Sequence, residues 1–341
     1  MTSAFEHTNS QLKCIDKGAG IFPNRTFARY SSSEFEPGYL RLFRSGDLGE
    51  RVHQAFQRLE NCDLCARYCH VNRLLTIDGA VCRTGERAVV HSFGPHHGEE
   101  AVLRGRKGSG TVFFSWCNLR CVFCQNWEIS QRGMGRIAGP RDIAAMMIDL
   151  QERGCHNINF VSPSHLVAQI LAAVEIAARG GLHLPLVYNT GGYDSLEALA
   201  LLDGVIDIYM PDIKYGDSSV ARQYSKVRNY VEANRMAVKE MHRQVGDLIL
   251  DECGLARRGL LIRHLVLPNN LAGTEKVLDF IAHEISPNTY LNLMDQYRPC
   301  YRADEYSPLN RPITSLEYRA ALAMAERHGL LRLDRRLSES A

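Results

Sequence analysis

The sequence predicts an α/β fold built on a parallel sheet, preceded by a cysteine-rich segment. Two observations carry this prediction. From about residue 111 onward, short β-rich runs alternate with helical patterns, and seven of the 11 cysteines lie between Cys62 and Cys124. Apolar strands that alternate with helices of ten or more residues imply right-handed crossovers and a parallel sheet. The length of 341 residues fits one large domain with an appendage.

Six strands with five helices between them are expected, and one more helix near the C-terminus. The strands are predicted at Thr111–Trp116, Asn157–Ser162, Leu184–Thr190, Asp207–Asp212, Leu260–Pro268 and Thr289–Asp295. The helices are predicted at Arg141–Arg153, near 165–179, 195–203, 218–245 and 274–285, and finally at Ser315–His328. Six such units can curl into an incomplete barrel or remain an open, doubly wound sheet. Both architectures place chemistry at the carboxyl ends of the strands.

The composition is that of a globular protein and excludes several other classes. Hydrophobic residues make up 45% and charged residues 23% of the chain, which rules out collagen-like and wholly disordered classes. The net charge is +2 without a long basic block, so no nucleic acid partner is expected. The longest apolar stretch, Leu166–Ala178, contains Gln169 and Glu175, so no membrane span is expected.

The cysteine usage predicts metal or redox chemistry in the cytoplasm. The N-terminal residues lack the apolar core of a secretory signal, so a cytoplasmic location is expected. Clustered cysteines in a reducing compartment favour metal ligation or redox chemistry over disulfides.

A compact cysteine motif follows the first expected strand. Cys117, Cys121 and Cys124 form C-x3-C-x2-C within SWCNLRCVFCQNW. Three thiolates on one loop can hold three irons of a [4Fe–4S] cube and leave the fourth iron without a protein ligand. The alternatives are a buried cysteine cluster or a three-thiolate zinc site completed by a histidine. Zinc motifs usually pair C-x2-C with a second couple at a distance, which favours the iron–sulfur interpretation.

This motif, with the aromatic Phe123 before its last cysteine, resembles the signature of the radical S-adenosylmethionine superfamily. The stretch GSGTVFFSWCNLRCVFCQNWEIS is similar to the branch of pyruvate formate-lyase activating enzymes. The resemblance implies a partial (β/α)6 TIM-type barrel over residues 106–300. A Cys-rich metal-binding extension would precede it at 1–105, and a C-terminal helix and tail would follow at 301–341.

The resemblance also implies the cofactors and the chemistry. S-adenosylmethionine would bind the open iron of the [4Fe–4S] cluster. One electron from the reduced cluster would cleave it to methionine and a 5′-deoxyadenosyl radical, which abstracts hydrogen from an unactivated C–H bond. Phe123, in the cluster loop, is expected beside this cofactor.

The end of the second expected strand departs from the family pattern. The family commonly carries Gly-Gly-Glu there, facing the methionine amino group, whereas this chain has VSPSH at positions 161–165. Ser162 and Ser164 are the expected substitutes. Their neutral hydroxyls accept from an ammonium more weakly than a carboxylate does.

Other strand ends match the family more closely. Asn189, at the end of the third expected strand, is expected to reach ribose hydroxyls. Asp212 and Lys214 resemble the family's Asp-x-Lys on the fourth strand, and Arg263 resembles the fifth-strand arginine that meets the methionine carboxylate. A planar guanidinium fork also has a chemical reason to bind a carboxylate.

A second cysteine motif lies upstream. Cys62, Cys65, Cys69 and Cys82 form C-x2-C-x3-C-x12-C. Four thiolates can close a structural zinc site or hold an auxiliary Fe–S cluster. The spacing fits neither the usual ferredoxin run nor a paired zinc ribbon, so both metals remain open. Unligated buried thiols are the third alternative.

Cys300 follows the last expected strand, in QYRPCYRADEY. An S–H group readily gives a hydrogen atom to a carbon radical, so Cys300 is a candidate hydrogen donor to a substrate radical. The alternative is a half-buried loop residue without a role.

Two functions remain open. In the first, the enzyme abstracts hydrogen from a small molecule, such as a sugar-containing natural product, with epimerisation or dehydrogenation. In the second, it installs a glycyl radical on a partner enzyme. The branch resemblance favours the second. The extra cysteine module, the thiol of Cys300 and the excess of arginine over lysine favour the first. Either reaction needs an electron from a reducing protein such as flavodoxin or ferredoxin.

Overall fold

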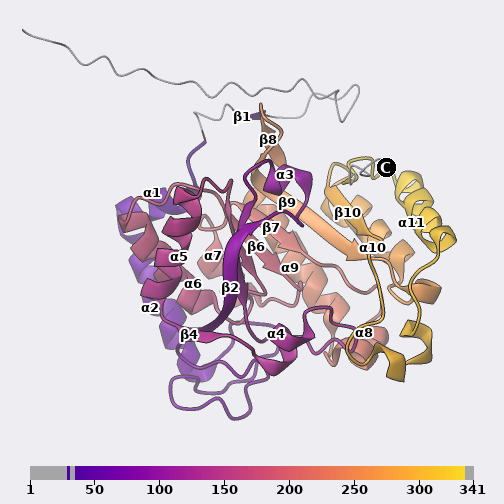
Figure 1. Ribbon diagram of the computed structural model, residues 1–341, viewed down its shortest axis with the longest axis horizontal. Helices are drawn as coiled ribbons and strands as arrows, with labels where there is room; N and C mark the ends of the chain where they lie inside the picture. The colour runs from indigo at the N-terminus through magenta and orange to yellow at the C-terminus, as the bar shows by residue number, and fades with distance from the viewer. Residues whose placement is uncertain (1–28, 31–34, 335–341) are drawn as a thin grey trace, which may run out of the picture.

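The computed structural model of the chain describes residues 29–30 and 35–334 (Figure 1). The start of the predicted front segment, up to residue 28, and the end of the predicted tail, from residue 335, lie outside the described residues, as does Cys14.

Six parallel strands form the centre of one sheet and lie side by side in chain order. They are β3 (Ser109–Phe114), β5 (Ile158–Val161), β6 (Leu186–Thr190), β7 (Ile208–Pro211), β9 (Ala256–Leu265) and β10 (Tyr290–Met294). Each overlaps one of the six expected strands, with ends that differ by up to four residues, so the prediction of an α/β fold with a mostly parallel sheet is confirmed. Within residues 29–30 and 35–334, the strand pairings do not close this sheet into a barrel.

Four further strands extend the sheet, and none of them was expected. β2 (Ala88–His96) pairs antiparallel with β3 and with β4 (Arg136–Ala138). Beside β9, β8 (Ile249–Asp251) pairs antiparallel, and β1 (Arg29–Tyr30) pairs with β8. Three of these strands have only two or three residues, which is too short for a period of two to be recognised.

Helices fill the crossovers between the parallel strands. They are α5 (Pro140–Glu152), α6 (Val167–Arg179), α7 (Leu196–Leu202), α8 (Ser218–Ser225), α9 (Tyr230–Val245) and α10 (Thr274–Phe280), which continues into a π-helical turn at Ile281–Ile285. The single helix expected over 218–245 is therefore wrong. Lys226 and Asn229 have φ of 55° and 48°, and such left-handed residues end one helix and begin the next.

The remaining helices flank this unit. α1 (Gly38–Ser45) and α2 (Asp47–Gln57) precede the front cysteines, which begin at Cys62, and α2 packs against α6. α3 (Ala101–Arg104) follows β2, and α4 (Trp127–Arg132) follows the loop that ends at Cys124. α11 (Ser315–Arg327) begins with a capping box between Thr314 and Glu317. The front segment thus adds the strands β1 and β2 to the main sheet and packs helices beside it, and the predicted boundary at residue 105 stays a prediction.

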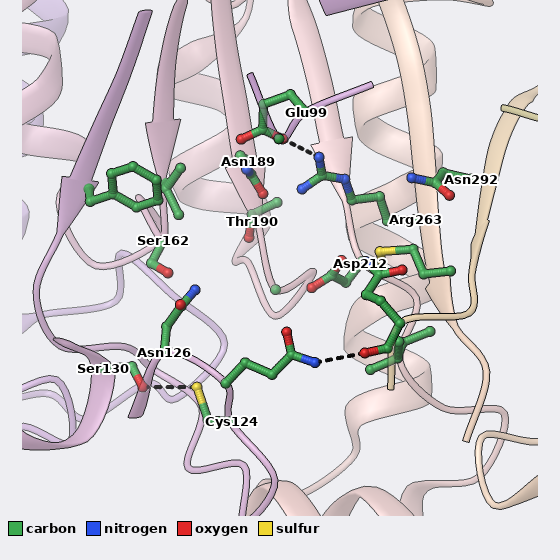
Figure 2. Close-up of a pocket in the computed structure, with 18 of the residues that line it drawn as sticks. Glu99, Cys124, Asn126, Ser130, Ser162, Asn189, Thr190, Asp212, Arg263 and Asn292 are labelled. Atoms are coloured by element: carbon green, nitrogen blue, oxygen red, sulfur yellow. Dashed lines mark hydrogen bonds and ion pairs between the residues drawn. The ribbon is translucent and has the colours of Figure 1, made fainter. Parts of the chain in front are cut away.

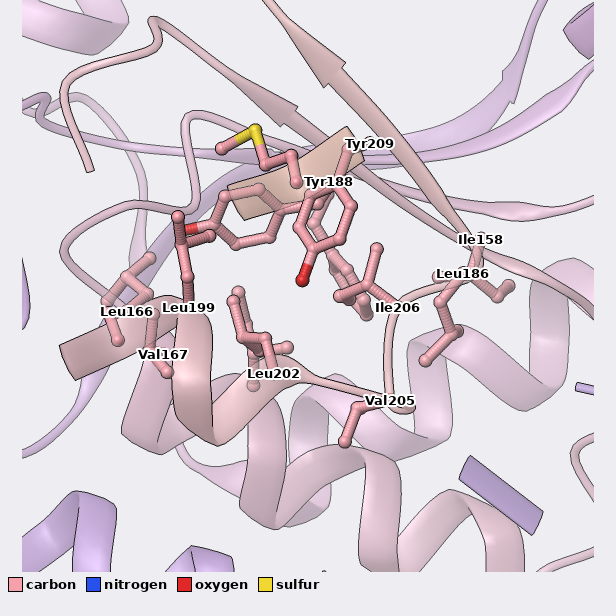
Figure 3. Close-up of a cluster of buried hydrophobic side chains, with 14 of the residues drawn as sticks. Ile158, Leu166, Val167, Leu186, Tyr188, Leu199, Leu202, Val205, Ile206 and Tyr209 are labelled. Atoms are coloured by element: carbon pink, nitrogen blue, oxygen red, sulfur yellow. The ribbon is translucent and has the colours of Figure 1, made fainter. Parts of the chain in front are cut away.

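The two faces of the sheet carry different side chains. On the outer face, Tyr188 and Tyr209 are fully buried and point toward Leu199 and Leu202 of α7 (Figure 3). Burying a large apolar side chain contributes roughly 1.5–3 kcal/mol, so this face carries much of the stability. Because side chains alternate along a strand, neighbours such as Asn189 point to the opposite, inner face. Polar residues collect there and line a cavity.

Candidate functional site

A cavity of about 720 Å³ extends along the inner face of the sheet (Figure 2). Cys117, Cys121 and Cys124 line one end of it, just beyond the carboxyl end of β3. Glu99 and Arg263 lie at the other end, as Figure 2 shows. The site thus combines a thiol-rich end with a charged, polar end.

The cysteine loop presents three thiols, each beside a polar group. The sulfur of Cys121 lies 2.9 Å from the Ser225 hydroxyl, and that of Cys124 lies 3.1 Å from the Ser130 hydroxyl (Figure 2). The backbone N–H of Leu119 donates to the Cys117 sulfur at 3.4 Å. Such donors stabilise thiolates and tune cluster potentials. Three thiols on one loop, each with a polar neighbour, fit the protein ligands of a [4Fe–4S] cluster.

The thiols of this loop are protonated when no metal is bound. Burial raises the pKa of Cys117 and Cys124, and it raises the pKa of Cys121 to about 12. Thiolates are the metal ligands, so loading a cluster must release these protons.

Asp212 and Lys214 form an ion pair on the wall of the cavity. Burial opposes the charge of Lys214, but Asp212, Cys121 and Tyr230 together outweigh burial, and the pKa of Lys214 is raised. The backbone N–H of Lys214 donates to the hydroxyl of Tyr230 at 3.0 Å, which holds this segment in place. Lys214 also lowers the pKa of Cys121, against the larger effect of burial, so a permanent cation lies close to the cysteine loop.

Arg263 lines the cavity, but two glutamates already bind its guanidinium. Its Nε and Nη2 donate to the Glu100 carboxylate at 2.7 and 2.6 Å, and Nη2 also pairs with Glu99. Asn292 donates to Glu100 at 2.6 Å. Burial opposes the charge of Arg263, yet Glu100 and Glu99 raise its pKa; burial likewise opposes the charge of Glu100, yet Arg263 lowers its pKa.

Glu99, Glu100 and Asn292 were not predicted as site residues. The two glutamates follow β2, and β2 itself was not expected. Asn292 lies in an expected strand, and its position in phase with the inward-facing residues of that strand was the signal that could have identified it.

The predicted serines and Asn189 separate into two groups. Ser162 and Asn189 line the cavity, and the N–H of Ser162 donates to the carbonyl of Asn189 at 3.0 Å. Ser164 is buried and does not line the cavity; its hydroxyl lies 2.8 Å from that of Thr190, which does line it. Phe123 lines the cavity and packs edge-on against Tyr297, with ring centroids 5.9 Å apart.

Cys300 lies in a segment that packs against the cysteine loop. The amide of Gln125 donates to the carbonyl of Gln296 at 3.0 Å, and the N–H of Arg302 donates to the carbonyl of Val122 at 2.9 Å. Cys300 is half-buried and does not line the cavity. The structure therefore brings Cys300 near the cluster loop, beside the cavity.

The four front cysteines are gathered in one irregular segment between α2 and β2. Cys62, Cys65 and Cys82 are buried, and Cys69 is partly exposed. Burial raises the pKa of Cys65, and the other three cysteines raise it further, Cys82 most. The four thiols are thus close enough to interact.

Comparison with known proteins supports the family expected from the motif. A family model described as the radical SAM superfamily matches residues 111–255. The uncharacterized protein MJ0674 of Methanocaldococcus jannaschii is 34% identical over 317 residues, which span 90% of this chain and 86% of that protein. MJ0808 of the same organism is 25% identical over 220 residues, which span 62% of this chain and 58% of that protein.

Solved structures give weaker similarities. Streptococcus suis SuiB bound to S-adenosylmethionine matches with a TM-score of 0.45 and 13% identity, over 64% of this chain and 47% of SuiB. The hydrogenase maturase HydG of Carboxydothermus hydrogenoformans matches with a TM-score of 0.46 and 12% identity, over 64% of this chain and 50% of HydG. In the described part of the chain, every helix is too short or too polar to cross a membrane.

Proposed function

Because the chain belongs to the radical S-adenosylmethionine superfamily, we propose that Cys117, Cys121 and Cys124 hold the catalytic cluster and that the enzyme abstracts hydrogen from a small molecule in the adjoining cavity. The family's cofactors are a [4Fe–4S] cluster and S-adenosylmethionine. When reduced by one electron, the cluster supplies the cleavage of S-adenosylmethionine to methionine and a 5′-deoxyadenosyl radical.

The residues of the cavity wall bind and orient the cosubstrate in this proposal. Ser162 and Asn189 supply neutral acceptors and donors for the methionine amino group and the ribose. The Asp212–Lys214 pair places one negative and one positive charge beside the cluster loop, where they can bind charged groups of the cosubstrate. The glutamates bind Nε and Nη2 of Arg263, and we assign its Nη1 to a contact with the cosubstrate.

The shape of the cavity favours a small substrate. Its volume of about 720 Å³ lies within the range of roughly 300–1,000 Å³ that is typical of small-ligand sites, and S-adenosylmethionine occupies part of it, which leaves room only for a small substrate. Its far end is closed by Glu99 and Glu100, whose side chains are 7% and 1% exposed. An activating enzyme must admit a loop of its partner protein, and this closed polar end suits a small polar molecule better. The proposal includes a partial (β/α)6 barrel as the frame of the cavity.

Within this proposal, Cys300 returns a hydrogen atom to the substrate radical, which would give epimerisation; the thiyl radical left on Cys300 then takes one electron from the reducing protein and one proton from solvent. Its place beside the cluster loop supports this role, although a small movement of residues 296–302 must expose the thiol to the cavity. In D2O, a thiol donor leaves one deuterium at the carbon attacked. A product without deuterium, or a full product yield from Cys300→Ala, removes Cys300 from the mechanism and favours dehydrogenation.

The test of the proposed function begins with 5′-deoxyadenosine. Protein reconstituted anaerobically with iron and sulfide and reduced with dithionite should convert S-adenosylmethionine to 5′-deoxyadenosine. The triple variant Cys117→Ala, Cys121→Ala, Cys124→Ala should lose this product. Cys155→Ala is the matched control, because Cys155 is buried in the main core, away from the cavity lining. Unchanged product formation by the triple variant would refute the assignment.

A second step separates the two candidate substrates. Polar small molecules are screened for those that accelerate 5′-deoxyadenosine formation. A hit is then labelled with deuterium at its C–H positions, and a true substrate should transfer deuterium to 5′-deoxyadenosine. A glycyl radical signal on a partner enzyme, with no small molecule that accelerates turnover, would instead support the activating enzyme.

A further inference from the structure

We propose that Cys62, Cys65, Cys69 and Cys82 hold a second [4Fe–4S] cluster and that this cluster passes electrons to the one at Cys117, Cys121 and Cys124. The relay rests on the proposed function, since it needs a catalytic cluster as acceptor. The second cluster itself does not rest on the proposed function, because it depends only on the four front cysteines. Four thiolates ligate all four irons, so this cluster has no open iron and serves electron transfer alone.

The surroundings of the front cysteines suit an anionic cluster. Arg73 is only 2% exposed, and its Nη1 donates to the sulfur of Cys62 at 3.5 Å. Its Nε donates to the carbonyl of Thr84 at 2.6 Å, which fixes the guanidinium against the cysteines. A buried cation is costly unless it is paired. Cluster thiolates supply the charge that pairs with Arg73.

The sequence spacing of the front cysteines favours a cube over zinc. Zinc motifs usually pair one C-x2-C couple with a second couple at a distance. The front motif has one such couple, Cys62 and Cys65, and its other two cysteines are separated by 12 residues. The iron and zinc counts of the first experiment below separate the two sites.

Trp116 connects the two cysteine sets. It precedes Cys117 in the chain, and the guanidinium of Arg83, which follows Cys82, lies over its indole ring at 5.3 Å from the centroid. Trp116 is held in a left-handed conformation, with φ of 67°, and packs against Gly133, where an added Cβ would lie 2.2 Å from the ring. The ring of Trp116, the residue before Cys117, is thus fixed against Arg83, the residue after Cys82.

Two further arginines make the same connection. Arg67, two residues after Cys65, donates from Nε to the carbonyl of Asn118, which follows Cys117, at 2.7 Å. Arg120, in the catalytic loop, donates to the carbonyl of Val81, the residue before Cys82. Three separate contacts therefore join a neighbour of a front cysteine to a residue of the catalytic loop. This arrangement holds the two cysteine sets at a fixed, short separation.

The electron balance of the relay is simple. A low-potential one-electron carrier protein, such as a reduced ferredoxin, is oxidised as the front cluster goes from the 2+ to the 1+ state. The front cluster returns to 2+ as the catalytic cluster goes from 2+ to 1+. Each step moves one electron, and no bond or proton changes place. Cys69, the partly exposed member of the front set, gives the carrier its nearest approach.

The first experiment counts metal and spins in the wild-type protein. Anaerobically reconstituted protein should hold about eight iron atoms and no zinc. After reduction, electron paramagnetic resonance should show two cluster signals, of which S-adenosylmethionine perturbs only one. About four iron atoms with one zinc, or a single cluster signal in fully loaded protein, would overturn the second cluster. This measurement needs no variant and is independent of turnover.

The second experiment tests the relay with the variant Cys62→Ala, Cys65→Ala, Cys82→Ala. This variant should keep about four iron atoms and the signal that S-adenosylmethionine perturbs, which shows that it is folded. Reduction of its catalytic cluster by reduced ferredoxin should slow by at least about tenfold relative to the wild type and to Cys155→Ala. Reduction by dithionite, which is small enough to enter the cavity, should be little changed. An unchanged rate with ferredoxin would overturn the relay. Absence of 5′-deoxyadenosine from protein with both clusters would refute the proposed function and leave the second cluster standing.

Discussion

Arg263 and Glu100 form a two-point ion pair at the closed end of the cavity, with Nε to Oε1 at 2.7 Å and Nη2 to Oε2 at 2.6 Å. The two residues are 163 positions apart in the chain. Glu100 directly precedes α3 and Arg263 lies on β9, so the pair ties the segment after β2 across the inner face of the sheet. It thereby closes the cavity opposite the cysteine loop.

Arg263→Met should lower the free energy of unfolding by about 3–5 kcal/mol, because it leaves Glu99 and Glu100 buried without a cation. Urea denaturation of the metal-free protein at neutral pH measures this change. The matched control is Arg302→Met. Arg302 makes the same two-point contact with Glu305, but on the surface, where water and salt screen the pair and its contribution to stability is small. Equal losses in the two variants would contradict the prediction.

Asp212→Asn should weaken binding of S-adenosylmethionine by about tenfold or more, which corresponds to about 1.4 kcal/mol, while the iron content stays unchanged. The substitution removes the charge that pairs with Lys214 in the cavity wall. Equilibrium binding to the loaded, oxidised protein gives the affinity, and elemental analysis gives the iron. Asp217→Asn, an exposed cap of α8, is the control. Loss of iron with unchanged affinity would place Asp212 with the cluster instead.

Gly133→Ala should destabilise the protein more than Gly46→Ala does. Both glycines are left-handed, with φ of 68° and 86°, so an alanine costs roughly 1–2 kcal/mol of strain at either position. The Cβ at position 133 would also lie 2.2 Å from the Trp116 ring, whereas the one at position 46 meets nothing within 4 Å. The clash should add about 1–3 kcal/mol, as overpacking typically does. Similar thermal melting of the two variants would show that Trp116 moves freely.

His264 should make the protein less stable in mild acid. It is buried, with Nδ1 donating to the Ile213 carbonyl at 2.6 Å and Nε2 3.0 Å from the Thr274 hydroxyl. Burial lowers its pKa to about 4. The unfolded chain, with a histidine pKa of about 6.5, therefore binds more protons between these values. The contribution of His264 to the free energy of unfolding is full above pH 6.5. It falls by about 1.4 kcal/mol per pH unit as the pH drops toward 4.

Urea denaturation at several pH values tests this dependence. His264→Gln should show a shallower loss of stability between pH 6.5 and 4 than the wild type, and exposed His283→Gln should not. The comparison between variants matters because Asp207 acts in the opposite direction. Burial raises its pKa to about 7, so its contribution falls as the pH rises toward 7. Identical slopes in wild type and His264→Gln would contradict the prediction.

The parallel strands could be predicted because each is a short apolar run bounded by a helix. Parallel strands that are buried on both faces have nearly continuous hydrophobic sequences. β7, with the sequence IYMP, is such a strand, because all four of its residues are buried. β2 escaped prediction because its sequence, AVVHSFGPH, mixes apolar and polar residues with Gly and Pro. The break between α8 and α9 escaped because it depends on two left-handed residues that are neither glycine nor proline.

Local motifs by themselves determined the cysteine loop of this protein. The eight positions from Cys117 to Cys124 bring three thiols together through covalent spacing alone, whatever the rest of the chain does. The same holds for Asp212 and Lys214, which are two positions apart and face one another as an ion pair.

Only the tertiary structure decided which distant residues share the site. Glu99 and Glu100 meet Arg263 because β2 folds back along β3, and Arg83 meets Trp116 because the front segment packs beside the cluster loop. Ser164 was predicted with Ser162, but it is buried behind the cavity wall, where its hydroxyl meets that of the lining residue Thr190. Contacts between residues far apart in sequence depend on how strands and loops pack together, and no local spacing encodes that packing.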